Sequence, residues 1–427
     1  MSVRFGSGPK ARPHSGPPRV GLFGLLGSGN LGNDASLEVA IAYLQENHPD
    51  AIFDAMCMGH EDLREKFHIE AEPQLWYLQY EGRFSGLSAA FLKIMGKGID
   101  AWHTARWVRR HNIVIVPGTG ILECTLPLRA SGVPLALFML CAAGRLFSTP
   151  VALVNVGANA TGQRLIGSLF KKSAELSSYR SFRDASSRDA IGLAGPDTQN
   201  DKVYADFVFG FPTPPEQPGD PNTVGVGVMA YYGGSDHRAQ ADAIYTNYIA
   251  AMQNFTRWLI DSGHRIRLFW SDNVDAVAVQ EIVSDLHEQR PGLDPAMVVA
   301  EPFSTLGDMM DELVKVRTVV GTRYHIVLAA LKLSKPTIAV GYSAKHEVLM
   351  ADMGLEDFCQ SARSVDLDRL IDQFKELEAR APALEHSIAQ ANADKIDLVH
   401  AQFAALSELL ESAGVARRQL ASAERDR

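Results

Sequence analysis

Arg323 and His325 are the two side chains of this sequence that are best suited to chemistry on an anion. They follow the apolar run 318–320, which predicts a strand, and precede 326–331, which predicts a helix. Both would then lie in the first turn of that helix, where free backbone N–H groups favour a phosphate or carboxylate. Since imidazole titrates near neutral pH, the pair predicts an anion site with a proton donor. The alternative is a solvated helix cap beside a buried, hydrogen-bonded imidazole.

Lys345 is a further cation that the same part of the chain would bring to this site. The apolar run 337–340 predicts a second strand, and it opens into a polar loop that contains Lys345. Ligands of open α/β sheets bind at the carboxyl ends of the strands, so this lysine is expected beside Arg323 and His325. A solvated loop lysine is the alternative.

Glycine-rich segments follow the predicted strands of the first half of the chain. Residues 24–34 follow the strand 19–23, and residues 117–120 follow the strand 113–116. Strands that alternate with helices predict a parallel sheet, and glycines at the strand ends let a ligand approach the backbone. The first segment also resembles the dinucleotide pattern G-x-G-x-x-G, with Asp54 as the acidic ribose ligand, so a nicotinamide cofactor is an alternative.

The sequence predicts two domains of the α/β class, since 427 residues are too many for one ordinary core. The proline-rich segment 212–221 is the predicted linker, because the sheet pattern restarts after it. The full prediction is a disordered arm at 1–18, a first domain at 19–211, a second domain at 222–383 and terminal helices at 384–427.

Composition excludes several classes of protein. Lys and Arg total 41 against 50 Asp and Glu, and this net charge of −9 argues against a general nucleic-acid binder. The four cysteines are scattered, so neither a disulfide framework nor a zinc site is expected. The longest apolar stretch, 133–144, is shorter than the roughly 20 residues that cross a bilayer, and no signal peptide is recognisable, which predicts a cytoplasmic protein.

One predicted helix could associate with a membrane surface. It carries Trp102 and Trp107 together with Arg106, Arg109 and Arg110. Such a basic amphipathic face could dock on anionic lipid at the inner face of the membrane. An ordinary solvated helix face is the alternative.

Five sequence blocks occur in the order that is found in one known family. Residues 24–35 look like its G-x-G-N-x-G-D/N-[DE] block, and residues 181–187, with Arg183, look like its x-R-D-x-x-S block. Residues 321–325 are similar to its x-R-L/Y-H block. The other two blocks are the glycine-rich strand ends 117–120 and 156–159, where Thr119, Ala158 and Asn159 replace glycines, and the D-x-x-F segment near 205–207 belongs with the block at 181–187. Together the five blocks resemble the signature of the polysaccharide pyruvyl transferase family.

The resemblance implies a fold of glycosyltransferase-B type, with two Rossmann-like domains facing a cleft. It implies transfer of the enolpyruvyl group of phosphoenolpyruvate onto two hydroxyls of a sugar, which leaves a pyruvate ketal and phosphate. Because the donor carries a phosphate and a carboxylate, Arg323, Arg183 and Lys345 are its expected ligands. His325, with a pKa near neutrality, is the expected general acid. Neither a metal nor a cofactor is expected besides phosphoenolpyruvate as co-substrate.

The same resemblance places the acceptor on the first domain. Its expected ligands are Gly29, Asn30, Gly32, Asp34, Gly118 and Gly120. The acceptor would be a sugar of a cell-surface polysaccharide or glycolipid precursor, lipid-linked or free. Asp34 could instead cap the helix that is predicted from residue 35. A nucleotide-sugar glycosyltransferase of the same shape and a non-catalytic sugar-phosphate binding protein are the alternative functions, and the sequence does not indicate an oligomeric state.

Overall fold

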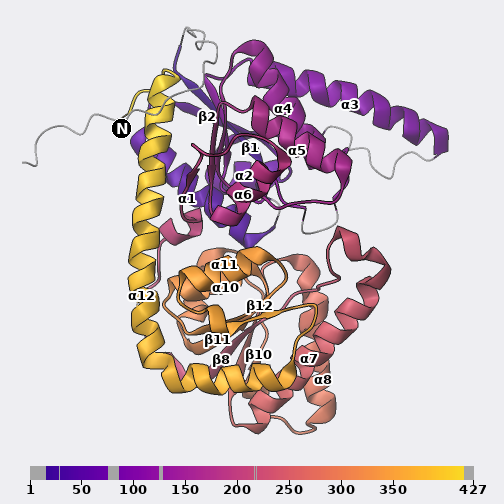
Figure 1. Cartoon of the computed structure of the whole chain (residues 1–427), viewed down its shortest axis with the longest axis vertical. Helices are drawn as coiled ribbons and strands as arrows, with labels where there is room; N and C mark the ends of the chain where they lie inside the picture. The colour runs from indigo at the N-terminus through magenta and orange to yellow at the C-terminus, as the bar shows by residue number, and fades with distance from the viewer. Residues whose placement is uncertain are drawn as a thin grey trace, which may run out of the picture.

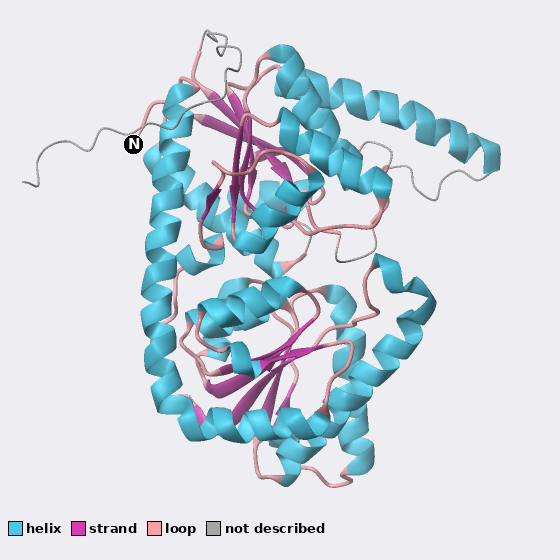
Figure 2. Cartoon of the chain, viewed as in Figure 1, coloured by secondary structure: helices cyan, strands magenta, loops and turns pink. Residues whose placement is uncertain are grey.

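The protein consists of two α/β domains, each built on a parallel sheet with helices against it (Figures 1 and 2). This confirms the predicted fold class. The computed structural model describes residues 16–27, 29–75, 86–124, 128–215, 217 and 219–417. Most of the predicted arm at 1–18 therefore lies outside the described residues.

The first domain contains a seven-stranded sheet of order β3-β2-β1-β4-β5-β6-β7. Its strands are β1 Arg19–Gly24, β2 Ile52–Cys57, β3 Glu70–Pro73, β4 Ile113–Pro117, β5 Val151–Val156, β6 Tyr179–Phe182 and β7 Lys202–Val203. Its helices are α1 Leu31–Asn47, α2 His60–Phe67, α3 Gly86–Val108, α4 Val133–Phe147, α5 Arg164–Leu176, α6 Ala185–Ala194 and the 3-10 helix η2 Phe207–Gly210. The chain changes direction across the sheet between β1 and β4, and ligands of such sheets bind at this switch point.

The second domain contains a six-stranded sheet of order β10-β9-β8-β11-β12-β13. Its strands are β8 Asp220–Gly227, β9 Arg265–Phe269, β10 Val298–Val299, β11 Val316–Gly321, β12 Thr337–Gly341 and β13 Cys359–Ser361. Its helices are α7 Ala241–Asp261, α8 Ala276–Gln289, α9 Leu306–Leu313, α10 Tyr324–Lys332 and α11 Ala344–Asp352, with 3-10 helices that include η4 Asn273–Asp275. Asp220, predicted in the linker, already pairs with Val316 of β11.

The apolar runs of the sequence form strands because both faces of each sheet are covered. Every residue of β4 and of β5 is buried, as parallel strands between two helix layers require. Helix α10 is buried along its whole length, since it packs against β11, β12, the terminal helix and η2 of the first domain. The carboxyl end of β11 and the start of α10 are thereby held at the boundary between the domains.

The terminal helix α12, Leu367–Ser412, connects the two domains a second time (Figure 1). Its first part packs on the second domain, and Asn392 donates to the carbonyl of Leu331 at 2.8 Å. Its later part returns to the first domain, where Gln402 accepts from Ser181 at 2.6 Å. The helix begins at Leu367, so residue 384, where terminal helices were predicted to start, lies inside it.

No helix in the described ranges is long and apolar enough to cross a membrane.

The face of helix α3 that was predicted to bind a membrane is only partly exposed. Trp107 is 1% exposed and donates its Nε1–H to Asp54, while Arg110 binds Glu72 at 2.7 Å. Trp102, 62% exposed with the Arg106 guanidinium 5.6 Å from its ring, remains on the surface. Docking on a membrane through Trp102 and its neighbours stays a prediction.

Candidate active site between the two domains

A cavity of about 160 Å³ lies between the domains, beside segments that follow strands of both sheets. The first domain contributes Leu25, Asn30, Asn33, Gly120, Glu123, Leu128 and Arg183, and the second contributes Ser271, Arg323, Tyr324, His325, Tyr342 and Lys345. The four side chains predicted for donor binding and catalysis thus line one space, although they are far apart in the sequence. The described residues include no cluster of three metal-ligating side chains.

Arg183 is held rigidly at the end of β6. Its Nη1 donates to Asp206 at 2.9 Å, its Nη2 donates to Glu123, and its side chain is 1% exposed. Burial alone would lower the pKa of Arg183, but Glu123 and Asp206 raise it, so the guanidinium stays charged. Asp184, 3.8 Å from Arg183, instead caps α6 by accepting from the backbone of Ser187. The pair of Arg183 and Asp184 is therefore not an ordinary surface ion pair.

Lys345 joins this cluster from the second domain. Its Nζ donates to Oε2 of Glu123 at 2.9 Å and lies 4.9 Å from the centre of the Tyr324 ring. Burial would raise the pKa of Glu123, but Lys345 and Arg183 together lower it to about 2. Because the lysine is 13% exposed, it is not a solvated loop residue.

Arg323 occupies the N-cap of α10 rather than its first turn, since the helix begins at Tyr324. Its Nε and Nη2 each lie 2.7 Å from an oxygen of Asp275, which is fully buried and also accepts from the backbone of Ala230. Such a two-point ion pair fixes the plane of the guanidinium. Arg323 therefore lines the cavity with an orientation set by the second domain.

His325 follows in the first turn of α10, and its ring packs against the start of α1. Within the described chain its buried Nε2 has no hydrogen-bond partner. Burial lowers the pKa of His325 to about 4, so the free imidazole is neutral at pH 7 rather than poised near neutrality as predicted. A Cβ on Gly32 would lie 1.9 Å from Cγ of this ring, so only glycine permits the contact.

The glycines expected to receive the acceptor make room for protein side chains. A Cβ on Gly118, whose φ is +47°, would lie 2.6 Å from Phe207. A Cβ on Gly120 would lie 2.9 Å from Cδ of Glu123, and one on Gly157 would lie 2.3 Å from its Oε1. Gly120 and Gly157 thus shape the wall that holds the carboxylate of Glu123, a residue that the sequence analysis did not single out.

Gly29, Asn30 and Asp34 of the first glycine-rich loop have different surroundings. Gly29, with φ +77°, provides a left-handed turn, and Asn30 is the N-cap of α1, with its side chain accepting from the backbone of Asn33 at 3.2 Å. Asp34 does not cap the helix, as the alternative prediction had it, because the N-cap of α1 is Asn30. Its Oδ1 accepts from the backbone of Gly27 at 2.8 Å.

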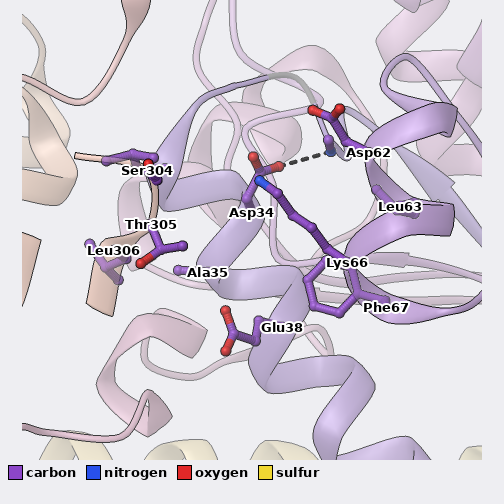
Figure 3. A pocket seen from close by; sticks show the side chains of 12 residues that line it. Asp34, Ala35, Glu38, Asp62, Leu63, Lys66, Phe67, Ser304, Thr305 and Leu306 are labelled. Carbon is purple, nitrogen blue, oxygen red and sulfur yellow. Dashed lines mark hydrogen bonds between the residues drawn. The ribbon is translucent and has the colours of Figure 1, made fainter. Parts of the chain in front are cut away.

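Asp34 lines a second, smaller pocket between the domains (Figure 3). Glu38, Lys66 and Phe67 of the first domain line it as well, opposite Thr305 of the second domain. The start of α1 thus contributes Asn30 and Asn33 to the main cavity and Asp34 to this second pocket.

Asp54 is committed to the fold, which removes the ribose ligand of the dinucleotide alternative. Trp107 Nε1 and His111 Nε2 approach its Oδ1 at 2.7 and 2.8 Å, and Arg19 binds its Oδ2 at 2.5 Å. The carboxylate lies within β2 and is 5% exposed.

Comparison with known proteins places this geometry in context. Solved structures with a similar fold include MnaA from S. aureus with UDP, at 11% identity and a TM-score of 0.58 over 93% of this chain and 97% of that one. HepE from Anabaena with UDP is 13% identical, with a TM-score of 0.57 over 92% of this chain and 100% of that one. The UDP-GlcNAc 2-epimerase from Neisseria meningitidis with UDP-GlcNAc is 12% identical, with the same TM-score and the same covered shares. At such identities the likeness concerns the fold alone, which is of the glycosyltransferase-B type.

No curated protein matches the sequence significantly. The model of one family, polysaccharide pyruvyl transferase, matches residues 30–344, which is well over half of the chain. The match extends from the N-cap of α1 to the start of α11 and includes both walls of the cavity. The chain therefore belongs to the polysaccharide pyruvyl transferase family.

Proposed function

We propose that this protein transfers the pyruvyl group of phosphoenolpyruvate to two hydroxyls of a sugar, which forms a ketal and releases phosphate. The observation that supports this most is the interdomain cavity, where Arg183, Arg323 and Lys345 meet His325. Guanidinium and ammonium groups bind phosphate and carboxylate oxygens through charge-assisted hydrogen bonds. Both kinds of oxygen are present in phosphoenolpyruvate.

The proposed reaction adds one proton to the methylene carbon of the donor, which becomes a methyl group. The neighbouring carbon forms one C–O bond to each of two sugar hydroxyls, and its C–O bond to phosphate breaks. Of the two protons that the hydroxyls release, one balances the proton added to carbon and the other leaves with phosphate. We assign His325 to the proton transfer at carbon, because it lines the cavity with an unpartnered Nε2 in the described chain.

Because the pKa of the free His325 is about 4, the imidazole can hold a proton at neutral pH only when the donor is bound. An anion close to an imidazole stabilises the charged form and raises the pKa. The two anionic groups of phosphoenolpyruvate would therefore let His325 take up a proton as the donor binds. The imidazolium then holds the proton that the methylene carbon receives.

We place the acceptor at the start of α1, because the side chains of Asn30 and Asn33 there line the cavity. The expected acceptor is a sugar of a cell-surface polysaccharide or glycolipid precursor. The start of α1 also lines the second pocket, whose carboxylates could bind hydroxyls of a neighbouring sugar in a longer acceptor.

The test compares the melting temperature of the protein with phosphoenolpyruvate, UDP-GlcNAc and NAD. We expect a rise with phosphoenolpyruvate in the wild type that Lys345→Met loses. Lys172→Met, at an exposed position of α5, is the matched control and should keep the rise. Phosphate release from phosphoenolpyruvate in the presence of sugar acceptors is the accompanying activity assay. No rise and no release with any acceptor would refute the proposal.

The main rival is an enzyme that acts on a nucleotide-sugar. The structures of MnaA, HepE and the Neisseria epimerase, which share the fold, contain UDP or UDP-GlcNAc. A rise in melting temperature with UDP-GlcNAc, but not with phosphoenolpyruvate, would favour this rival. A non-catalytic sugar-phosphate binding protein would show a rise without turnover.

A further inference from the structure

We propose that the carboxylate of Glu123 occupies a subsite for anionic oxygens between Arg183 and Lys345, and that the phosphate or carboxylate of the donor displaces it. The inference rests on the proposed function only in that the donor is an anion. Glu123 would thus act as an internal competitor that holds the two cations in place until the donor arrives.

The charge of the cavity requires such an exchange. Each of the three cations that line it already has a carboxylate partner: Arg183 binds Glu123 and Asp206, Lys345 binds Glu123, and Arg323 binds Asp275. Asp184 and Asp272 add negative charge 3.8 Å from the two guanidiniums. A donor with two anionic groups therefore gains little attraction from this cavity while every carboxylate stays in place.

Glu123 is the carboxylate that is most easily displaced. Asp206 also accepts from the backbone of Val208 at 3.1 Å, and Asp275 accepts from the backbone of Ala230 at 3.0 Å, so both are anchored to the main chain. The hydrogen bonds of the Glu123 carboxylate within the described residues all come from the two cations. Glu123 lies outside helices and strands, so its side chain can rotate away without disrupting either.

The position of the Glu123 carboxylate suits a donor group. It lies in the wall of the cavity that His325 also lines, and the absence of a side chain at Gly120 and Gly157 provides its space. Arg183 and Lys345 would keep their orientation after the exchange, because Arg183 remains bound to Asp206 and Lys345 remains near the Tyr324 ring. An incoming carboxylate or phosphate would accept the same hydrogen bonds.

The experiment measures the affinity of the full-length protein for inorganic phosphate, pyruvate and phosphoenolpyruvate by isothermal titration calorimetry. In Glu123→Gln the competing charge is gone, and we expect phosphoenolpyruvate to bind on the order of tenfold more tightly. Tighter binding of phosphate but not pyruvate would assign the subsite to the phosphate group, and the reverse would assign it to the carboxylate. Unchanged or weaker binding of all three probes would overturn the proposal.

Two further variants keep the result interpretable. Glu123→Asp retains the charge but shortens the side chain, so it should weaken the contact with at least one cation. We therefore expect it to bind the anions more tightly than the wild type does, as Glu123→Gln should. It serves if Glu123→Gln does not fold. Glu288→Gln removes an exposed carboxylate of α8 and should leave all affinities unchanged.

The outcomes also separate this inference from the proposed function. If the glutamine variant binds phosphate more tightly while neither protein binds phosphoenolpyruvate, the subsite stands and the donor assignment fails. If the wild type releases phosphate from phosphoenolpyruvate but the variant shows no gain in affinity, the function stands and the subsite is wrong.

Discussion

Asp54 and Glu123 are two carboxylates of the same domain whose side chains are 7% and 13% exposed, yet their surroundings differ. The partners of Asp54 are Arg19, Trp107 and His111, which all belong to the first domain. His111 also directs its Nδ1 at the carbonyl oxygen of Trp107, 2.8 Å away. Both ring nitrogens of His111 thus lie against oxygens of the first domain, which fixes the orientation of the ring.

Glu123, in contrast, binds one cation from each domain beside a cavity. Its two oxygens have lysine and arginine donors that a ligand can also use. A carboxylate whose partners are fixed in one core stabilises the fold, whereas a carboxylate that bridges two domains at a cavity can be exchanged for a ligand. The predictions below test this distinction.

The largest effect is expected for Asp54→Ala. The change leaves the Trp107 N–H, the His111 imidazole and the Arg19 guanidinium without their acceptor, which should lower the free energy of unfolding by about 3–5 kcal/mol. Urea unfolding followed by circular dichroism measures it. A loss below about 1 kcal/mol would mean that the cluster of Asp54, His111 and Arg19 is not structural.

The same cluster should be visible in the pH dependence of stability. Burial raises the pKa of Asp54, but His111 and Arg19 outweigh it, so the net shift is downward. A lowered pKa contributes stability above the ordinary carboxyl range, and this stability is lost as the pH falls through the lowered pKa. The acid limb of the stability curve should therefore be shallower in Asp54→Ala than in the wild type.

His325→Gln should reduce phosphate release by on the order of 100-fold or more and leave the melting temperature nearly unchanged. The glutamine retains a polar group but cannot transfer a proton in the neutral range. His287→Gln, on the exposed face of α8, is the matched control and should retain full activity. Equal activity of the two variants would exclude His325 as the proton donor.

Gly32→Ala should have a smaller effect on activity, of roughly tenfold. The added methyl would overlap the His325 ring, so the ring must move away from its place in the cavity. Steady-state phosphate release should show a lower kcat with a nearly unchanged KM for phosphoenolpyruvate. A change confined to KM would instead indicate that Gly32 contacts the donor.

Proton uptake on donor binding is a subtler effect. Because a bound anion raises the pKa of His325 from about 4, binding should take up protons at pH values between the free and the bound pKa. Calorimetry at pH 6 in two buffers with different ionisation enthalpies measures this uptake. The affinity should increase as the pH falls through the same window, and His325→Gln should abolish the uptake.

The smallest effect is expected for Trp102→Ala, which should alter the free energy of unfolding by less than about 0.5 kcal/mol. Trp102 is exposed, in contrast to Trp107, which donates to Asp54. Flotation with anionic vesicles tests the separate prediction that this helix docks on lipid.

Much of the fold could be predicted because buried parallel strands leave a local signal. The segments that became β4, β5 and β12 are mostly apolar runs bounded by glycine, proline or polar residues, and the predicted run 318–320 forms the later part of β11. The start of α12 was not predicted, since terminal helices were expected from residue 384 and the helix begins at Leu367. The fold was therefore more predictable than the ends of its elements.

Among the residues predicted for the site, its cations, its histidine and, on the acceptor side, Asn30 and Gly120 line the cavity. Arg183, Arg323, Lys345 and His325 stand out by residue type at the ends of strands, and the structure brings them together. Their partners could not be predicted, since the contact between Glu123 and Lys345 joins residues 222 positions apart. Only one weak signal marked Glu123, which is an acidic residue in an apolar stretch directly after a glycine-rich turn.

The path of α12 has a consequence for the synthesis of the protein. The core of the first domain is completed by this late segment, because Tyr43 of α1 stacks on Phe403 and shares a hydrogen bond with Ser407. Because α12 follows both domains in the sequence, the surface of the first domain is closed only after this helix has left the ribosome. The first domain is therefore translated first but completed last. Chaperones accordingly have more time to act on the first domain than on the second.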